Sequence, residues 1–425
     1  MSGSDLTLPR GIRDIEPDEF ELQARVEKTF EEVASLFNFS MMEPAPLEHL
    51  SILRAKSGAD VDKEVYAFKD KGGRDIGLRF DLTVGMTRFV CGRKDLRPPI
   101  KLASLAGAWR YDEPQHARYR WFKQWDMEIF GPPSIESDAE VIEATCTLFE
   151  KLGLQRVTVQ IGDRGTVQRF IHGVLNIRDD AKAVELMRAL DHVQRTARSD
   201  LLAEYSRRGY KNEDLAKLFE FGSIRGPPEK VLEELGKQQL EAPALEALAD
   251  AMRGRGVEAE FNLGVVRGID YYTGVVFEVV DSAHPESGSL AGGGRYDLLP
   301  TAFGRPDLSA TGAAGGMERI ALSLPKEAGH GRTLVYVAVA GLRGSREESR
   351  RILRKLRERG FPAESALLQR PLSKQLEDAS RAGASWVLIL GEREVKSGRV
   401  TLRNMADRSE EFIPIDSALS RIAGP

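Results

Sequence analysis

The sequence contains little cysteine, no long apolar run and almost no net charge. Only two cysteines occur in 425 residues, and Cys91 and Cys146 lie far apart and outside any CxxC pattern. A disulfide framework and a zinc site are therefore not expected. No apolar run approaches the length of a membrane-spanning helix, and residues 1–11 lack the hydrophobic segment of a secretion signal. These absences favour a cytoplasmic protein.

The charge balance limits the expected partners. The net charge is −4, so a general attraction to nucleic acid is not predicted, and any RNA contact must come from local patches. Hydrophobic residues make up 41% and charged residues 30% of the chain, as in an ordinary globular protein. Because this length exceeds what one hydrophobic core usually supports, we expect two or three domains.

The clearest pattern is a predicted hairpin over residues 109–131. The segment 101–110 is predicted to be one strand, and a charged loop at 111–120 leads into the second. In the second strand the side chains alternate with period two. Lys123, Trp125, Met127 and Ile129 fall on one face, and Phe122, Gln124, Asp126 and Glu128 fall on the other. The second face is either wetted by solvent, as at an ordinary sheet edge, or it is the floor of a pocket.

Three further segments carry polar side chains in similar patterns. Residues 78–84 alternate as a strand, with Arg79, Asp81 and Thr83 on one face. Residues 265–280 are predicted to form another strand, with Arg267, Asp270, Tyr271 and Tyr272 near its start. Residues 312–320 are predicted to be small-residue turns that end in Arg319 at the beginning of a helix.

The remaining segments predict a mixed architecture. We expect a helix over 17–37 and a strand over 39–50 that Pro44 and Pro46 break. A further helix is expected to begin at a capping box formed by Ser137 and Glu140 and to end at Gly153, and a strand is expected over 156–162. Residues 169–255 are predicted to be charged helices. After a linker at 325–330, strands and helices alternate, with a final hairpin from about 395 to 415.

In this order, the segments resemble the signature segments of histidyl-tRNA synthetases, a family of class II aminoacyl-tRNA synthetases. The hairpin resembles class II motif 2, residues 312–319 resemble motif 3, and residues 39–50 resemble motif 1. RGIDYYTGVVFE at 267–278 and AGGGRYD at 291–297 resemble two peptides particular to the histidine enzymes, and the likeness begins with LPRGIRDI at 8–15. Ordered motifs are strong evidence, whereas a glycine-rich turn alone would be weak.

The resemblance implies an α+β fold, in which helices flank the antiparallel sheet of a class II synthetase. Residues 1–168 and 256–325 would form the two parts of the catalytic domain. Residues 169–255 would be a helical insertion, which in this family approaches the tRNA acceptor arm. Residues 331–425 would be a C-terminal α/β anticodon-binding domain.

One stretch of that last domain is strongly basic. Residues 341–360 hold eight Arg or Lys against three Glu, and Ile352, Leu353 and Leu356 supply an apolar stripe. A basic helix face is usually only solvated. Because residues 371–405 resemble the anticodon-binding domain shared by the histidyl, glycyl, prolyl and threonyl enzymes, we interpret the face as a contact for the RNA backbone.

The resemblance implies that arginines hold ATP, since a guanidinium forms bidentate hydrogen bonds with phosphate. Arg110 corresponds to the arginine at the α-phosphate, and Arg319 to the arginine at the far end of ATP. Asp112 and Phe122 correspond to residues that grip the adenine, Phe122 by stacking. Arg267 corresponds to an arginine near the α-phosphate, where other class II enzymes place a metal ion.

The metal and cofactor predictions follow from the same resemblance. The residues near Arg267 include no carboxylate cluster that would hold a dedicated third metal ion. We therefore expect ATP with Mg²⁺ as a substrate complex, no tightly bound cofactor and no metal fixed by the protein alone. The alternative for Arg267 is that it only pairs with Asp270 or another acid and pins its strand.

The resemblance also implies which residues bind the amino end of histidine. Asp81 and Thr83 correspond to residues that bind the ammonium group, and the backbone of Leu82 lines the pocket between them. Gln124 corresponds to the contact on the carboxylate side. An ammonium group needs hydrogen-bond acceptors, which these residue types provide.

The imidazole pocket of the family corresponds to Glu128, Tyr271 and Tyr272. For each tyrosine the alternative is a hydrophobic filler with a satisfied hydroxyl. Gln115, in the motif 2 loop, is expected to read the end of the acceptor stem. Ala117 stands where the family loop commonly has glycine.

The implied function is that of a homodimeric histidine–tRNA ligase, which forms histidyl-adenylate from histidine and ATP and transfers histidine to the 3′ end of its tRNA. One alternative is the synthetase-like regulatory subunit of ATP phosphoribosyltransferase, which lacks the anticodon domain; residues 331–425 weigh against it. A second alternative is a class II synthetase for another amino acid, which the peptides at 267–278 and 291–297 oppose.

Overall fold

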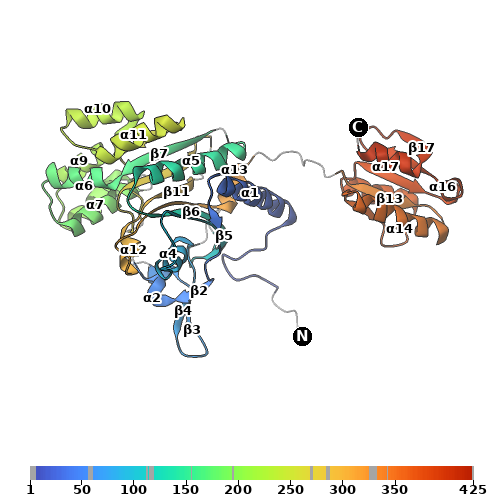
Figure 1. Cartoon of the computed structure of the whole chain (residues 1–425), viewed down its shortest axis with the longest axis horizontal. Helices are drawn as coiled ribbons and strands as arrows, with labels where there is room; N and C mark the ends of the chain where they lie inside the picture. Colours follow the sequence, from blue (N-terminus) through green and yellow to red (C-terminus); the bar gives the residue numbers. More distant parts are fainter. Residues whose placement is uncertain are drawn as a thin grey trace. The chain divides into compact units, whose positions relative to one another are not determined.

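The computed structural model describes residues 6–55, 61–111, 113, 119–154, 156–193, 196–268, 271–283, 288–324, 333–341 and 343–423. The chain forms two units, Met1–Leu324 and Pro325–Pro425, called here the N-terminal and the C-terminal unit (Figure 1). Each unit has its own sheet and its own buried core. Within the described residues, no helix is long and apolar enough to cross a membrane.

A sheet of nine described strands, in the order β1-β5-β6-β12-β11-β10-β7-β9-β8, forms the frame of the N-terminal unit. The strands are β1 Ser40–Met41, β5 Ile100–Trp109, β6 Trp121–Gly131, β7 Val157–Asp163, β8 Arg225–Gly226, β9 Glu260–Asn262, β10 Val275–Asp281, β11 Ser289–Arg295 and β12 Ser309–Gly316. β5 and β6 pair antiparallel, with Ile100 opposite Phe130 and Trp109 opposite Trp121. The two strands of the predicted hairpin are therefore confirmed.

Helices cover both faces of this sheet. α1 Pro17–Leu36, α5 Ile135–Lys151 and α13 Met317–Ser323 pack on one face, where the apolar side chains of β6 join the main core. α4 Thr83–Cys91 and α12 Leu298–Ala302 pack on the other face. This second face also carries a three-stranded sheet in the order β2-β4-β3. Its strands and the short helices beside it are β2 Leu47–His49, α2 Leu50–Leu53, α3 Val61–Glu64, β3 Ala67–Lys69 and β4 Asp75–Leu78.

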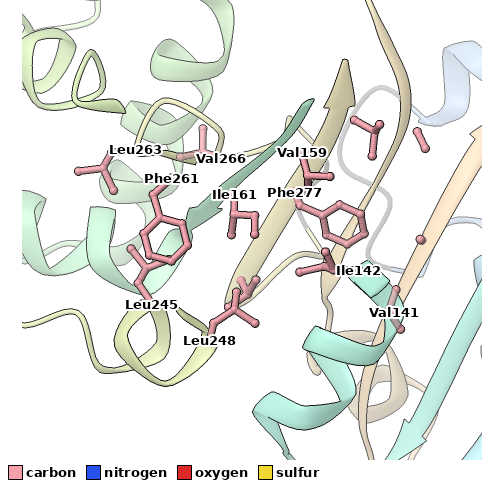
Figure 2. Close-up of a cluster of buried hydrophobic side chains, with 14 of the residues drawn as sticks. Val141, Ile142, Val159, Ile161, Leu245, Leu248, Phe261, Leu263, Val266 and Phe277 are labelled. Carbon is pink, nitrogen blue, oxygen red and sulfur yellow. The ribbon is translucent and has the colours of Figure 1, made fainter. Parts of the chain in front are cut away.

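The region between β7 and β9 consists mainly of helices in its described residues and also holds the two-residue strand β8. Its helices are α6 Arg164–Gly173, α7 Asp180–His192, α8 Arg198–Arg207, α9 Asn212–Phe221, α10 Pro228–Lys237 and α11 Pro243–Arg255. The prediction of helices over 169–255 is confirmed, although α6 begins a few residues earlier. Leu245 and Leu248 of α11 share one buried cluster with Ile142 of α5 and Ile161 of β7 (Figure 2). This cluster joins the helical region to the sheet.

The C-terminal unit is a smaller α/β structure, with strand order β14-β13-β15-β16-β17. Its elements are β13 Val335–Val339, α14 Arg343–Glu358, β14 Ala363–Ser365, α15 Leu372–Arg381, β15 Trp386–Leu390, α16 Glu392–Ser397, β16 Arg399–Asn404, β17 Glu410–Pro414 and α17 Ile415–Ala423. The predicted alternation is confirmed, and Ile352, Leu353 and Leu356 of α14 are buried. The predicted hairpin begins at Arg399 rather than at 395, because α16 ends only at Ser397 and is capped by Gly398, which has a φ of 64°.

One predicted strand near the centre of the N-terminal unit is wrong, and another begins later than predicted. β4 ends at Leu78 and α4 begins at Thr83, so residues 78–84 are not one strand. Asp81 forms the turn between them, because its Oδ1 accepts a hydrogen bond from the backbone nitrogen of Val84 at 3.1 Å. β10 begins only at Val275, and Arg267 has a φ of 55°, which is left-handed and incompatible with a strand.

Two further boundaries differ from the predictions. Residues 312–316 belong to strand β12 rather than to turns, and the helix begins after Gly316. Ser137 is not a helix cap, because α5 begins at Ile135 with Ser134 before it. Gly153, with a φ of 81°, follows the end of α5 as predicted.

Candidate active site

The polar face of β6 is buried inside the N-terminal unit. Gln124, Asp126 and Glu128 are 5%, 0% and 1% exposed, while Trp125 and Met127 point into the core on the opposite side. The predicted alternation is therefore confirmed. The alternative of a solvated edge is wrong, because β5 and β12 pair with β6 on its two sides.

One hydroxyl group links the two carboxylates of this face. Thr83 Oγ1 lies 3.0 Å from Asp126 Oδ2 and 2.8 Å from Glu128 Oε1, and Gln124 Nε2 donates to Asp126 Oδ1 at 2.8 Å. Thr83 is the first residue of α4, so the helix start delivers its side chain to β6. Leu82, directly before it, is fully buried. A hydroxyl has a single hydrogen, so Thr83 donates to one carboxylate at a time. If the other carboxyl carries a proton, it donates to Thr83 Oγ1, and both contacts are then hydrogen bonds.

Tyrosines form a wall beside Glu128. Tyr296 donates a hydrogen bond to Glu128 Oε2 at 2.5 Å. The ring of Tyr271 lies 5.6 Å from that of Tyr296 and 4.9 Å from that of Tyr272, measured between centroids, and all three rings are buried. Gly312, opposite Glu128 on β12, leaves room for this carboxylate, because a Cβ there would lie 1.5 Å from Glu128 Oε2.

Burial and mutual repulsion shape the electrostatics of this cluster. Burial, followed by the charge of Asp126, raises the pKa of Glu128 well above its usual range. Burial also raises the pKa of Asp126, to which the charge of Asp81 adds. The pKa of Asp81 is raised by burial too, although its hydrogen bond from Val84 and the nearby Arg110 oppose the shift. Three carboxylates kept from water favour a positively charged partner.

Arg110 lies at the end of β5 and is held from two sides. Its Nε donates to the backbone oxygen of Phe80 at 2.9 Å, and its guanidinium carbon lies 5.0 Å from the ring centroid of Phe122. The structure thus brings Arg110 and Phe122 together, as a cationic group on an aromatic face. Asp112, Gln115 and Ala117 lie outside the described residues.

Arg267 lies in the loop before β10 and reaches the neighbouring strands. Its Nη1 donates to Glu278 Oε1 at 2.8 Å, and its guanidinium carbon lies 5.9 Å from the ring centroid of Tyr272. Burial opposes its charge, but Tyr272 and Glu278 outweigh this effect and raise the pKa of Arg267. A Cβ on Gly292 of β11 would lie 2.1 Å from Arg267 Nη1, so glycine provides the space for the guanidinium. The alternative for Arg267 was a structural pair with Asp270 or another acid. Arg267 does pair with an acid, Glu278, and Asp270 lies outside the described residues.

Arg319 is the third residue of α13. Its Nη1 donates to the backbone oxygen of Ser289 at 3.0 Å. The preceding Glu318 accepts a hydrogen bond from the backbone nitrogen of Lys123 at 3.0 Å, which ties the start of α13 to β6. Arg319 is therefore fixed to the sheet that carries the carboxylates of β6.

The sequence prediction missed three polar residues of the site. Asp126 was placed on the correct face of β6 without a role, although its position between Gln124 and Glu128 was a usable signal. Tyr296 lies in the peptide AGGGRYD and Glu278 in RGIDYYTGVVFE, so both were quoted but not singled out. Tyr296 and Glu128 are 168 residues apart in the sequence, so no local pattern indicates their contact. Glu278 lies only 11 residues after Arg267, but the pair forms because the loop before β10 brings Arg267 back to this strand.

Comparison with known proteins extends these observations. A family model described as histidyl-tRNA synthetase matches residues 11–320, and one described as an anticodon binding domain matches residues 335–424. The chain belongs to the histidyl-tRNA synthetase family. It is therefore a class II aminoacyl-tRNA synthetase, and the predicted fold class and enzyme class are confirmed.

Relatives in this family match the chain over nearly its whole length. The histidine–tRNA ligase of Archaeoglobus fulgidus is 34% identical over 97% of this chain and 98% of its own length. The ligase of Thermococcus kodakarensis is 35% identical over 97% of both. The histidyl-tRNA synthetase structure from Nostoc sp. PCC 7120 shares the fold, with a TM-score of 0.83 and 22% identity over 99% of both chains.

A second solved structure bears on the alternative function. It is titled an ATP phosphoribosyltransferase regulatory subunit/histidyl-tRNA synthetase from Bacillus halodurans, with a TM-score of 0.75, 22% identity, and coverage of 92% of this chain and 99% of its own. At this identity the likeness concerns the fold alone. The match of residues 335–424 to an anticodon binding domain and the full-length ligase relatives disfavour the regulatory-subunit alternative for this member of the histidyl-tRNA synthetase family.

Proposed function

We propose that this chain activates histidine with ATP to histidyl-adenylate and pyrophosphate, and then transfers histidine to the 3′ end of its tRNA. The observation that carries the proposal is the buried polar face of β6, where Thr83 and Tyr296 hold two carboxylates. Such groups recognise a ligand with two cationic or hydrogen-donating ends, and histidine has an ammonium group and an imidazole.

The amino end of histidine would lie at the start of α4. Asp81 and Thr83 supply acceptors for the ammonium group, the backbone of Leu82 lines the pocket, and Gln124 faces the carboxylate of the substrate. Asp126 lies between these groups and Glu128, so its charge adds to the attraction for the ammonium. The side chains that bind the substrate are already hydrogen-bonded to one another, which preorganises the pocket.

The imidazole end would lie between Glu128 and the tyrosines. Glu128 accepts a hydrogen bond from one ring nitrogen, and Tyr296 fixes the orientation of this carboxylate. Tyr271 and Tyr272 close the sides of the imidazole pocket. A wrong amino acid would leave Glu128 buried without its partner, which is costly.

We expect histidine to bind more weakly as the pH falls from about 8 to about 6. Because burial raises the pKa of Asp126 to about 7, this carboxyl takes up a proton as the pH falls through neutrality, and a protonated carboxyl no longer attracts an ammonium group. Calorimetric titration of wild type and Asp126→Asn should show a flatter pH dependence in the variant. The imidazole of free histidine titrates in both experiments, so the difference isolates Asp126. Identical pH dependences would contradict the role of Asp126.

ATP, with Mg²⁺ as part of the substrate complex, would lie along the open ends of the same strands. Arg110 would hold the α-phosphate and Phe122 would stack on the adenine, together with Asp112. Arg319 would hold the far end of ATP. Phosphate oxygens gain negative charge during the reaction, and fixed guanidinium groups stabilise this charge without having to reorganise.

Arg267 would take the part that a metal ion plays in other class II enzymes. In the described residues no group of three or more His, Cys, Asp or Glu side chains is arranged to hold a metal ion. The guanidinium of Arg267 would contact the histidine carboxylate and the α-phosphate, which aligns the nucleophile with the phosphorus. Arg267 and Arg110 are therefore the residues that we place at the reacting atoms.

The tRNA would contact three regions. Gln115 would read the end of the acceptor stem, and the insertion at 169–255 would approach the acceptor arm. The anticodon arm would bind the residues from 331 onward, where the exposed basic face of α14 lies. A hollow of about 490 Å³ on this face is lined by Arg350, Leu353, Arg354, Arg357 and Glu358. We also propose a homodimer through residues 39–50.

A chain that ends at residue 324 should retain histidine-dependent pyrophosphate exchange but charge tRNA roughly 10²-fold more slowly. The residues assigned to both small substrates lie in the N-terminal unit, whereas the anticodon-binding domain is removed. The measurement compares pyrophosphate exchange and aminoacylation in the fragment and the full chain, after circular dichroism has shown that the fragment is folded. Loss of exchange in a folded fragment would contradict the assignment of histidine and ATP binding to the N-terminal unit alone.

A further inference from the structure

The loop that carries Arg267 is held by an arginine from a different element. Arg164, the first residue of α6, is 6% exposed. Its Nη1 donates to the backbone oxygens of Val266 at 2.8 Å and of Arg267 at 2.9 Å. Its backbone nitrogen donates to the oxygen of Gly274 at 3.1 Å. Arg164 thus contacts both ends of the segment that precedes β10.

This segment lies unusually close to the neighbouring strand β7. A Cβ on Gly162, two residues before Arg164, would lie 2.0 Å from the backbone oxygen of Val265. Asp163 caps α6 by accepting hydrogen bonds from Gly165 and Thr166, and so fixes the position at which Arg164 leaves the strand. The strand, the cap and the buried guanidinium together determine the path of the backbone up to Arg267.

Arg267 needs such support because its backbone is left-handed. With a φ of 55°, it has a conformation that residues with a side chain rarely adopt and that persists only when the surroundings impose it. If Arg267 relaxed to a negative φ, its side chain would leave the backbone in another direction, away from Glu278 and the space above Gly292. The two carbonyl groups on either side of its Cα would then no longer both face Arg164.

We propose that Arg164 is a positioning residue of the adenylation reaction, which acts by holding the backbone of Arg267 so that its guanidinium reaches the reacting atoms. The inference rests on the proposed function of Arg267. Arg164 does not contact the substrates in this account. It couples α6, where the helical insertion begins, to the arginine that takes the part of a metal ion.

The test begins with Arg164→Met, which keeps a long side chain but removes both hydrogen bonds to the carbonyl groups. Single-turnover adenylate formation should fall by roughly 10- to 10²-fold, the scale expected for a displacement of about 1 Å at a reacting group. The dissociation constants of histidine and ATP should change by less than about threefold. Arg164→Lys, which retains donors, should recover part of the rate. It also serves as the test variant if Arg164→Met does not fold.

Arg198→Met is the matched control outside this segment. Like Arg164, Arg198 is the first residue of a helix, α8, and its Nη2 donates to a backbone oxygen, that of Ala216 at 3.3 Å. Its replacement should leave adenylation unchanged. An equal loss of rate in both variants would mean that Arg164 acts only through general stability, and would overturn the proposal.

The decisive measurement is a double-mutant cycle between Arg164→Met and Arg267→Lys. If Arg164 acts through Arg267, the double variant should form adenylate within about threefold of the rate of Arg267→Lys alone. A double variant whose loss is the product of the two single losses would overturn the inference while leaving the role of Arg267 intact. A normal rate in Arg267→Lys alone would overturn the proposed role of Arg267 and this inference with it.

Discussion

Arg267→Lys should lower the single-turnover rate of adenylate formation by roughly 10²- to 10³-fold, the usual cost of losing one preorganised donor. Lysine keeps the positive charge but lacks the planar fork that contacts the histidine carboxylate and the α-phosphate together. Binding of histidine and of ATP should change much less, because the loss concerns the transition state. Rapid-quench measurement with enzyme in excess gives this rate.

The competing explanation is that Arg267 only forms a structural pair with Glu278. In that case Arg267→Lys and Glu278→Gln would both form adenylate at near-normal rates and would both unfold at lower temperature. Arg255→Lys is the control for a general effect of exchanging arginine, because Arg255 pairs with Glu136 and Glu143 away from the site. It should leave the rate unchanged.

Glu128→Ala should raise the KM for histidine by about 10²- to 10³-fold and leave ATP binding nearly unchanged. The variant removes the acceptor for the imidazole and leaves the hydroxyl of Tyr296 buried without its partner. Steady-state pyrophosphate exchange at varied histidine and varied ATP separates the two effects. We expect the intact pocket to be selective without an editing domain, because sites built on such hydrogen bonds discriminate by roughly 10⁴ to 10⁵.

Glu140→Ala provides the matched control for this prediction. Glu140 is a carboxylate of α5 that pairs with Lys101 rather than with the polar cluster of β6. Its loss should leave the KM for histidine within about twofold of wild type, since removing such an ion pair costs little. An unaltered KM in Glu128→Ala would remove Glu128 from the histidine pocket.

The sequence predicted the regular parts of the site well and the connecting parts poorly. The hairpin strands succeeded because their side chains alternate over many residues, and this pattern allows a single register. The prediction for 78–84 failed because the apparent alternation crosses a turn that Asp81 stabilises by a side-chain hydrogen bond. A period-two pattern over so few residues does not reveal where a strand ends.

The glycines beside the site could not be interpreted from the sequence for a different physical reason. Gly312 was predicted to lie in turns, which is wrong, and no structure was predicted for Gly292; Gly292 lies inside β11 and Gly312 inside β12. Their missing side chains make room for Arg267 and Glu128, which come from other elements. The sequence shows the glycines but not the side chains that fill the space above them, so only the folded chain reveals their role.

The most direct test of the proposed function is ATP–pyrophosphate exchange by the full chain, measured with each of the twenty amino acids in turn. We expect exchange with histidine alone. Exchange with another amino acid would contradict the assignment of Glu128, Tyr271 and Tyr272 to an imidazole pocket. The absence of exchange with every amino acid, in a chain shown to be folded, would contradict the proposal that this site forms an adenylate.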